Sequence, residues 1–145
     1  MRSRNFFAAV GLAIVAHAPL GAQGIGGKWS VIWDADIRMD HDTAIAKARK
    51  PATLELTQRG DSVFGTWSSG IEAGISLKGT FDGRAIRMSS AVTERSGMRD
   101  GQPMKMKVRW DVRGALNGSA LAGTLFIYLG DMAPPPRRWE AKRLP

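Results

Sequence analysis

The stretch that most constrains the fold is LELTQRGDSVFGTW, residues 54–67, which has the pattern of a complete β-hairpin. Apolar side chains alternate with polar ones on both sides of a polar turn, so each strand has one apolar face. With Arg59 and Gly60 as a two-residue loop and Gly60 at positive φ, Leu56 would face Val63. The stretch therefore predicts two half-buried antiparallel strands.

The same plan returns at Asp82-Gly83 and at Asn117-Gly118. Asp-Gly and Asn-Gly between alternating runs are the strongest short-range hairpin signals in a sequence. With each dipeptide as the loop, the apolar side chains of both strands again fall on one face. Three hairpins built alike predict an antiparallel meander. The predicted facing pairs include Leu54 with Gly65, Gly79 with Ile86 and Val112 with Gly123.

Alternating patterns elsewhere bring the predicted total to eight strands in a single all-β domain. Eight strands joined in sequence can close into a small antiparallel up-and-down barrel, which leaves no exposed edge. Glycines on the inward face favour closure, because a tapered, bent wall alternates small and large residues. The competing fold is an open β-sandwich. The predicted strands are residues 27–33, 52–58, 62–69, 73–81, 84–92, 103–114, 119–128 and 137–143.

Three segments interrupt the alternation. Residues 34–51 are interpreted as a long loop with a short helix over 43–50, because good helix formers follow Asp42, a suitable N-cap. Residues 93–103 are polar and are predicted to form a loop. Residues 130–136 contain three consecutive prolines, which indicates a stiff connection rather than a central strand.

Residues 1–22 have the pattern of a secretory signal peptide. Residues 1–5 are basic, residues 6–20 are apolar, and the small Ala22 suits cleavage directly after it. A membrane anchor is the alternative, but the apolar run is shorter than the roughly 20 residues of a spanning helix. Residues 23–145 would then form one mature domain that is periplasmic or secreted.

The mature domain would be basic and free of cysteine. Removing Arg2 and Arg4 from the 21 basic residues leaves 19 against 13 acidic ones, a net charge of +6, and no Cys is present to form disulfides. This charge favours an anionic surface or an acidic polysaccharide as partner, whereas nucleic acid is not expected outside the cell. The alternative is a solvated outer wall, because basic residues follow the strand period. These residues are Lys105, Lys107, Arg109 and Arg113.

Gly27-Lys28-Trp29 opens the first predicted strand, and Trp139-x-Ala-x-Arg143 ends the last one. The first motif resembles the glycine, any residue, tryptophan motif of lipocalins and related barrel families. The resemblance implies that Trp29 packs against Arg143 at the closed end of the barrel. It also implies that the long loop after the first strand covers the open end. The repeated Leu-x-Leu-x-x-x-Gly hairpins and the Trp-x-Ala-x-Arg ending look similar to exported bacterial β-barrel domains of unknown role.

No catalytic residue is predicted. The chain has no Cys, and His41, the one His of the mature domain, is not near a serine in a strand-turn-helix elbow. Together with His41, the residues Asp34, Asp36, Asp40 and Asp42 could offer ligands to a cation, but their spacing matches no calcium loop. A solvated acidic loop is the favoured interpretation, and neither a metal nor a cofactor is expected.

Large apolar side chains on the inward alternation form the candidate ligand site. Eight strands enclose space for side chains or for one small ligand. Aromatic and flexible methionine side chains suit an apolar ligand, with residues 39–51 as the lid. The same side chains can equally fill the barrel as core. The candidates are Trp33, Trp67, Met88, Met104 and Met106.

Two functions from different classes are therefore expected alternatives. The first is a non-enzymatic carrier or sensor that binds a small apolar molecule inside the barrel. The second is an interaction module, such as an inhibitor or a surface-binding subunit, with a filled barrel and no ligand pocket. A cavity at the mouth would favour the first, whereas a filled barrel with an exposed patch would favour the second.

Overall fold

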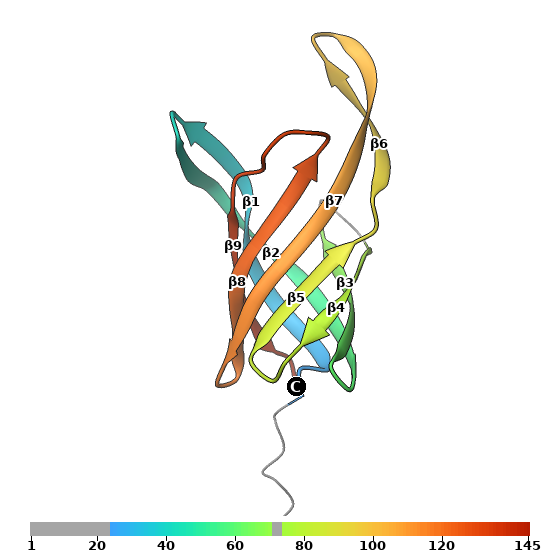
Figure 1. Ribbon diagram of the computed structural model, residues 1–145. Helices are drawn as coiled ribbons and strands as arrows, with labels where there is room; N and C mark the ends of the chain where they lie inside the picture. Colours follow the sequence, from blue (N-terminus) through green and yellow to red (C-terminus); the bar gives the residue numbers. More distant parts are fainter. Residues whose placement is uncertain (1–23, 71–73) are drawn as a thin grey trace, which may run out of the picture.

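The computed structural model describes residues 24–70 and 74–145 and shows an all-β protein (Figure 1). These residues form nine strands and no helix, hence none that could cross a membrane. The predicted signal peptide lies outside the described residues. The strands are β1 (Gly27–Asp40), β2 (Thr43–Arg59), β3 (Ser62–Ser69), β4 (Ile75–Phe81), β5 (Ala85–Ser90), β6 (Thr93–Arg99), β7 (Gln102–Asn117), β8 (Ala120–Leu129) and β9 (Arg137–Arg143).

Eight of these strands close a barrel, which confirms the predicted architecture. Neighbouring strands pair antiparallel in the order β5-β4-β3-β2-β1-β9-β8-β7, and β5 pairs with β7 to complete the circle. The remaining strand, β6, pairs with residues 102–108 of β7, beyond the part that β5 covers. The closed circle excludes the open sandwich.

The segment predicted as a loop with a short helix is instead a β-hairpin. β1 continues to Asp40 and β2 begins at Thr43, with His41 at a φ of 52° in the turn. The predicted helix over residues 43–50 is therefore wrong, since these residues pair with β1. Cross-strand hydrogen bonds outweigh the weak helical preference of a few Ala and Lys residues.

Residues 93–103, predicted as a loop, also form a hairpin. β6 and β7 meet at Asp100-Gly101, where both residues have positive φ, as a type I′ turn requires. The Asp-Gly signal is present in the sequence, but the residues around it do not alternate apolar with polar. This hairpin and the β1–β2 hairpin extend past the rim of the barrel and diverge there (Figure 1).

All three predicted hairpin turns lie one residue later than expected. Arg59 pairs with Ser62, so Gly60 takes the first loop position, and Gly83 and Gly118 do the same. Positive φ at the first position alone is typical of a type II′ turn. The facing pairs are displaced by two residues, yet the same faces point inward, because side-chain direction has a period of two. Observed pairs include Leu54 with Trp67, Gly79 with Met88 and Val112 with Leu125.

Two inward glycines allow neighbouring strands to approach closely. A Cβ atom at Gly79 would lie 1.8 Å from the carbonyl oxygen of Arg87. A Cβ atom at Gly123 would lie 1.9 Å from the carbonyl oxygen of Arg113. Any side chain at either position would force the strands apart, so the close approach requires glycine.

A one-residue displacement between β5 and β6 changes which side chains face inward. Both strands pair with β7, but the segment that links β5 to β6 is one residue longer than the stretch of β7 that lies opposite it. In the gap, the Ser90 hydroxyl accepts a hydrogen bond from the backbone N–H of Trp110 at 2.9 Å. This bulge places the odd-numbered residues of β6, including Arg95, on the inward face.

Four tryptophans fill the middle of the barrel. Trp33, Trp67, Trp110 and Trp139 are each at most 2% exposed. The ring centroid of Trp67 lies 5.6, 6.0 and 6.2 Å from those of Trp33, Trp110 and Trp139. Two of these contacts are edge-to-face, an arrangement that aromatic pairs prefer. At this level of the barrel, side chains occupy the interior.

Candidate functional site at the mouth of the barrel

Above the tryptophan core, the barrel holds a cavity of about 270 Å³. Trp33 and Trp110 line it and also belong to the core, so the cavity lies directly against the packed interior. Its walls combine strands from the start and the end of the chain, because β1 lies beside β9 in the barrel and β8 and β7 follow next. The apolar wall consists of Ala35, Met106, Val108, Ile127 and Leu129.

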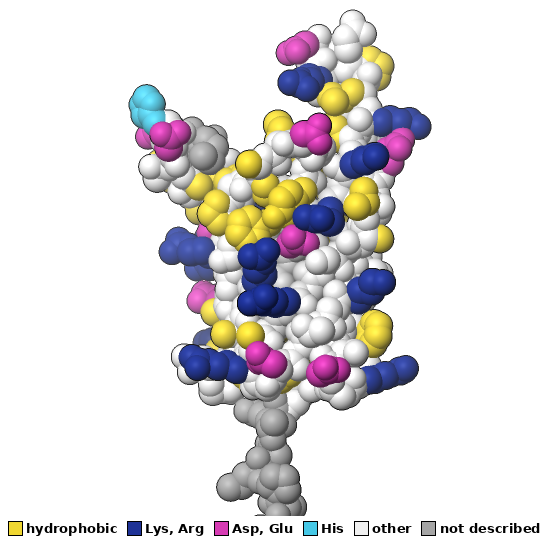
Figure 2. All heavy atoms as spheres, in the orientation of Figure 1, with side chains coloured by type: hydrophobic (Ala, Val, Ile, Leu, Met, Phe, Trp, Pro, Cys, Tyr) yellow, Lys and Arg dark blue, Asp and Glu magenta, His cyan; other side chains and the backbone are white. Residues whose placement is uncertain are grey.

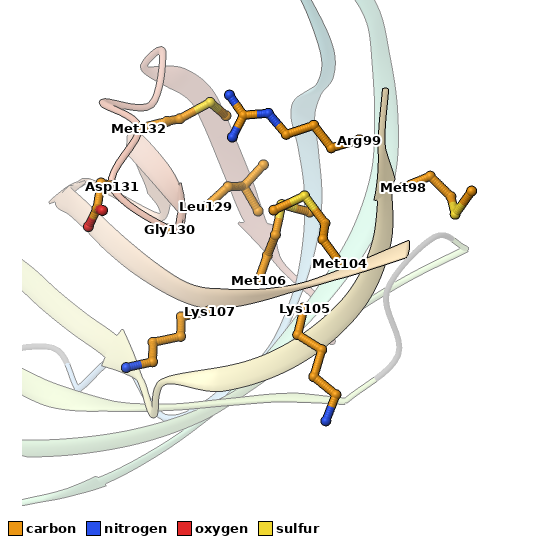
Figure 3. Close-up of a pocket in the computed structure, with 10 residues that line it drawn as sticks. All are labelled: Met98, Arg99, Met104, Lys105, Met106, Lys107, Leu129, Gly130, Asp131 and Met132. Atoms are coloured by element: carbon orange, nitrogen blue, oxygen red, sulfur yellow. The ribbon is translucent and has the colours of Figure 1, made fainter. Parts of the chain in front are cut away.

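An open groove of about 840 Å³ adjoins this cavity and shares Met106 and Leu129 with it. Figure 3 shows Met104 and Met106 on the inner side of β7, pointing toward Leu129, with Met132 nearby. Lys105 and Lys107 point away from the groove because they alternate with the methionines along the strand. The groove is therefore lined mainly by apolar side chains, with Arg99 and Asp131 also on its lining, while the lysine side chains of β7 extend from the opposite face of the strand.

The rim of the mouth exposes large apolar side chains on both sides. Met98 of β6 is 68% exposed, Met132 after β8 is 60% exposed, and Ile45 of β2 is 40% exposed. Figure 2 shows hydrophobic side chains gathered toward the open end, with Lys and Arg spread over the wall. Exposed apolar groups that cluster around a hollow are typical of a binding surface.

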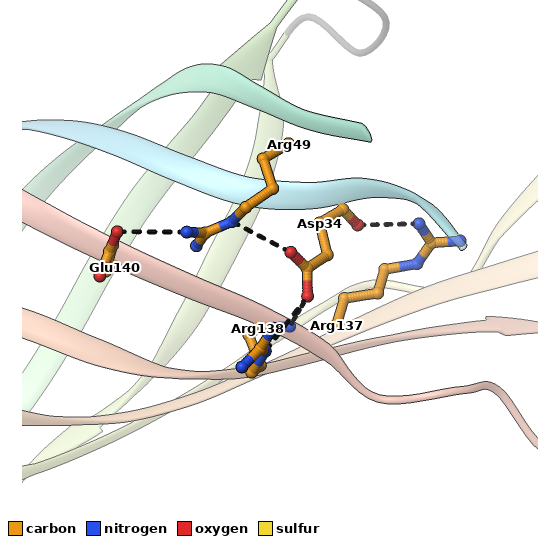
Figure 4. A network of polar contacts seen from close by, with 5 residues as sticks. All are labelled: Asp34, Arg49, Arg137, Arg138 and Glu140. Carbon is orange, nitrogen blue, oxygen red and sulfur yellow. Dashed lines mark hydrogen bonds and ion pairs between the residues drawn. The ribbon is translucent and has the colours of Figure 1, made fainter. Parts of the chain in front are cut away.

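Arg137 of β9 brings a positive charge to the cavity wall (Figure 4). Its Nη1 donates hydrogen bonds to the carbonyl oxygens of Asp34 at 3.0 Å and Ala35 at 2.7 Å. The guanidinium carbon also lies 5.9 Å from the ring centroid of Trp33. Loss of solvation on burial lowers the pKa of Arg137, and the opposing effect of Asp36 and Asp34 only partly offsets it. Arg137 nevertheless stays charged at neutral pH.

The carboxylate of Asp34 points toward Arg49 and Arg138, whereas its backbone carbonyl oxygen faces Arg137 (Figure 4). Asp34 is 3% exposed and accepts hydrogen bonds from Arg49 Nε and from the backbone N–H of Arg138, both at 3.1 Å. Arg49 Nη1 also lies 3.4 Å from Glu140 Oε1. This network joins β1, β2 and β9 where β1 leaves β9, so it holds the base of the β1–β2 hairpin.

Three buried indole N–H groups have no hydrogen-bond acceptor among the described residues: those of Trp33, Trp67 and Trp110. Trp139 differs, because its Nε1 donates to the carbonyl oxygen of Arg113 at 3.2 Å. An unsatisfied buried donor costs about 1–3 kcal/mol. Trp33 and Trp110 also line the cavity, but their Nε1 atoms are inaccessible, so the surface that these two indoles present to it is apolar.

The structure divides the five predicted ligand-binding residues between hollow and core. Trp33 and Met106 line the cavity, and Met104 lines the adjoining groove. Trp67 and Met88 are 0% and 2% exposed, and neither lines these two hollows. The candidate site therefore lies at the mouth, and the predicted positions deeper in the barrel belong to the packed core.

The predicted lid is wrong. Residues 39–51 lie in β1, β2 and the turn between them, so they form one arm of the mouth.

Arg137 was not singled out from the sequence. The strand period could have identified Arg137, because Arg137, Trp139 and Ala141 alternate on one face of β9. An arginine on the same face as two buried residues points to a position beside the core.

At the opposite end, Arg143 lies over Trp29, the contact that the lipocalin resemblance implies. The two residues pair between β1 and β9, and the guanidinium carbon lies 4.7 Å from the indole centroid. Arg143 also donates hydrogen bonds to the carbonyl oxygens of Gly24 and Gly26. Trp29 Nε1 donates to the carbonyl oxygen of Ile25 at 3.0 Å. These contacts tie the segment before β1 across the closed end.

The acidic segment and the basic wall are both partly engaged within the chain. In the described residues, no three His, Cys, Asp or Glu side chains are grouped so that they could hold a metal ion. On the outer wall, Arg109 lies 4.4 Å from the ring centroid of Tyr128 and 3.3 Å from Asp111 Oδ2. Arg113 lies 5.5 Å from the ring of Phe126. Part of the positive charge of the wall is thus held by neighbouring aromatic and acidic groups.

Comparisons of the chain with protein-family models and with curated proteins found no match. The resemblance to lipocalins therefore rests on the closed antiparallel barrel and on the contact between Trp29 and Arg143.

Proposed function

We propose that this chain is an exported, lipocalin-like, non-enzymatic barrel that binds a small apolar molecule at its mouth. The observation that carries the proposal is the cavity of about 270 Å³ that lies against the tryptophan core and continues into the apolar groove. Ligand sites are typically concave, mostly apolar and aromatic, with a few polar groups that orient the ligand. The mouth has this composition, whereas the interior below it is filled by side chains.

The interaction module remains the second candidate. The tryptophans that fill the lower barrel favour it, as do the exposed Met98 and Met132 at the rim. A protein partner, however, would need the rim surface alone, whereas a small ligand would use both the rim and the cavity behind it. The basic, apolar and small-residue pattern of residues 1–22 supports export to the periplasm or beyond.

Tryptophan fluorescence of the mature protein, residues 23–145, tests the ligand proposal. Trp33 and Trp110 line the cavity, so an apolar ligand should change their emission in a saturable way. Suitable probes are a long-chain alcohol, its methyl ether and a fatty acid. Met106→Gln, which places an amide of similar length in the apolar wall, should weaken binding about tenfold.

Lys107→Gln is the matched control, because Lys107 is the next residue of β7 and points away from the hollow. It should leave the affinity unchanged. Circular dichroism must show that both variants fold. If no probe gives a saturable change in the folded wild-type protein, the ligand proposal fails and the interaction module becomes the better interpretation.

A further inference from the structure

Arginines are aligned on neighbouring strands of the outer wall. Arg87 of β5 lies directly opposite Arg113 of β7. On the other side of β7, Arg113 lies opposite Thr124 of β8, which in turn lies opposite Arg138 of β9. The three arginines are exposed and form one row across the strands, which we call the arginine belt. Figure 2 shows Lys and Arg side chains on the wall that β7 and β8 present to the viewer.

The two arginines that face each other in this belt lack an acidic partner. Like charges directly opposite each other on a strand pair are destabilising. Among the described residues, neither Arg87 nor Arg113 forms an ion pair with a carboxylate. Elsewhere on the wall the arrangement is the opposite, because Lys28 faces Glu55 and their charged atoms lie 3.3 Å apart. An added anion would therefore relieve a repulsion that the strand pairing imposes.

The carboxylates around the belt are bound mainly to other groups. Asp111 pairs with Arg109 at 3.3 Å. Backbone hydrogen bonds are the main cause of the lowered pKa of Asp82, and the charge of a belt arginine contributes least to it. Asp34 lies 3.5 Å from Arg138 Nε, but the side chain of Arg138 stays 79% exposed. The belt therefore keeps most of its positive charge for an external partner.

An open depression of about 310 Å³ lies beside the facing arginines. Lys78 of β4 lines it together with Arg87 and Arg113, and Ser89 adds a hydroxyl group. The guanidinium carbon of Arg113 lies 5.5 Å from the ring centroid of Phe126. A guanidinium that lies over a ring keeps its in-plane N–H donors for the oxygens of an anion. Cations from three neighbouring strands thus surround one hollow on the outer wall.

We infer that the arginine belt and this depression form a docking surface for a linear acidic polysaccharide whose carboxylates pair with arginines of successive strands. Charge complementarity carries the inference, because the belt is basic and its facing arginines are unpaired. Neighbouring strands are about 4.8 Å apart, which is close to the length of one sugar unit. Hydroxyl groups of Thr124 and Ser89 lie between the charges and suit the hydroxyl groups of a sugar.

A polysaccharide fits this wall better than a membrane surface does. Proteins that lie on membranes insert large apolar side chains between their basic ones. The largest apolar residues that line the depression, Met88 and Val112, are at most 2% exposed. The docking surface lies outside the barrel, so it is independent of the ligand proposed for the mouth.

A matched pair of polymers tests the inference without any mutation. Polygalacturonate and its methyl ester have the same sugar chain, but only the first is charged at neutral pH. Calorimetric titration of the mature wild-type protein at low salt should show that polygalacturonate binds at least about tenfold tighter, and added salt should weaken this binding. Equal affinities, or no binding of either polymer, would overturn the inference. Tighter binding to anionic phospholipid vesicles or to double-stranded DNA would overturn the choice of partner.

Variants assign the binding to the belt. Arg87→Gln should weaken binding of polygalacturonate about tenfold without lowering the thermal midpoint, because it also removes the repulsion with Arg113. Lys142→Gln is the control, since it removes one exposed charge of β9 at the closed end, and should leave the affinity nearly unchanged. Both variants should keep the response to apolar probes at the mouth. Wild-type affinity for polygalacturonate in folded Arg87→Gln would overturn the assignment.

Discussion

The lower barrel and the two hairpins at its mouth are both built from antiparallel strand pairs. The two regions differ in the number of neighbouring strands and in the burial of their side chains. In the lower barrel each strand has neighbours on both sides, and the tryptophan side chains are at most 2% exposed. In the hairpins, β6 pairs with β7 alone, and β1 beyond Asp34 pairs with β2 alone, among the described residues. Hydrogen bonds hold both regions, but burial stabilises mainly the lower one. The lower barrel therefore provides stability, and the mouth provides accessible apolar surface.

The largest effect is expected from Trp67→Ala. Trp67 is fully buried and contacts three other tryptophan rings, so its removal should cost about 3–5 kcal/mol of the free energy of unfolding. Urea denaturation followed by circular dichroism measures this loss. Met104→Ala in the β6–β7 hairpin is the comparison and should cost less than about 1 kcal/mol. Similar losses for both variants would contradict the division between a stabilising core and a weakly packed mouth.

An intermediate effect is expected at the base of the β1–β2 hairpin. Asp34→Ala removes the acceptor of Arg49 and of the Arg138 backbone N–H, and should cost about 1–3 kcal/mol. Hydrogen exchange should accelerate in the hairpin more than in β3, because the network holds the hairpin base. Glu55→Ala is the control, since its pair with Lys28 is solvent-exposed and worth about 0–1 kcal/mol. Unchanged exchange in the hairpin would show that strand pairing alone holds it.

The smallest effect is expected at the β4–β5 turn, which lies at the closed end. Asp82 Oδ1 accepts hydrogen bonds from the backbone N–H groups of Ala85 at 2.7 Å and Arg84 at 2.9 Å, and these bonds hold the pKa of Asp82 below 3.8. A lowered pKa means that the carboxylate stabilises the fold at pH values above 3.8. This contribution is lost as the pH falls through the lower folded-state pKa.

Asp82→Asn should accordingly lower the thermal midpoint slightly at neutral pH, and the difference from wild type should vanish in strong acid. Thermal denaturation of both proteins over the acid range measures it. A difference that stays constant with pH would mean that the carboxylate charge does not support this turn.

The sequence predicted the lower barrel well because local and global requirements coincide there. Alternation with a period of two, glycine at tight turns and glycine at close strand contacts are all local patterns. Even where the turns lay one residue later than expected, the inward faces were right, because the facing pairs moved by two residues and side-chain direction repeats every two residues. The contact of Arg143 with Trp29 was expected from a motif, and not from these patterns.

The sequence did less well at the mouth for the same physical reason. Residues 43–50 and 93–99 form strands that have little core to cover, so their side chains carry no regular apolar period. Without that period, weak helix propensity and polarity were the only local signals for these segments. The Asp100-Gly101 dipeptide was the one clue that pointed correctly to a hairpin.

By itself the sequence determined an all-β chain of antiparallel hairpins and the identity of its apolar faces, because these follow from the alternation of side chains along each strand. The pairing of β5 with β7 decided that the strands close into a barrel rather than an open sandwich. Only the tertiary structure decided that four tryptophans fill the interior and that the hollow lies above them. It also decided that Arg137 reaches this hollow while its neighbour Arg138 binds Asp34 outside. Such arrangements depend on which strands meet around the barrel, and contacts between β1, β7 and β9 join residues too far apart in the chain for any local pattern to specify.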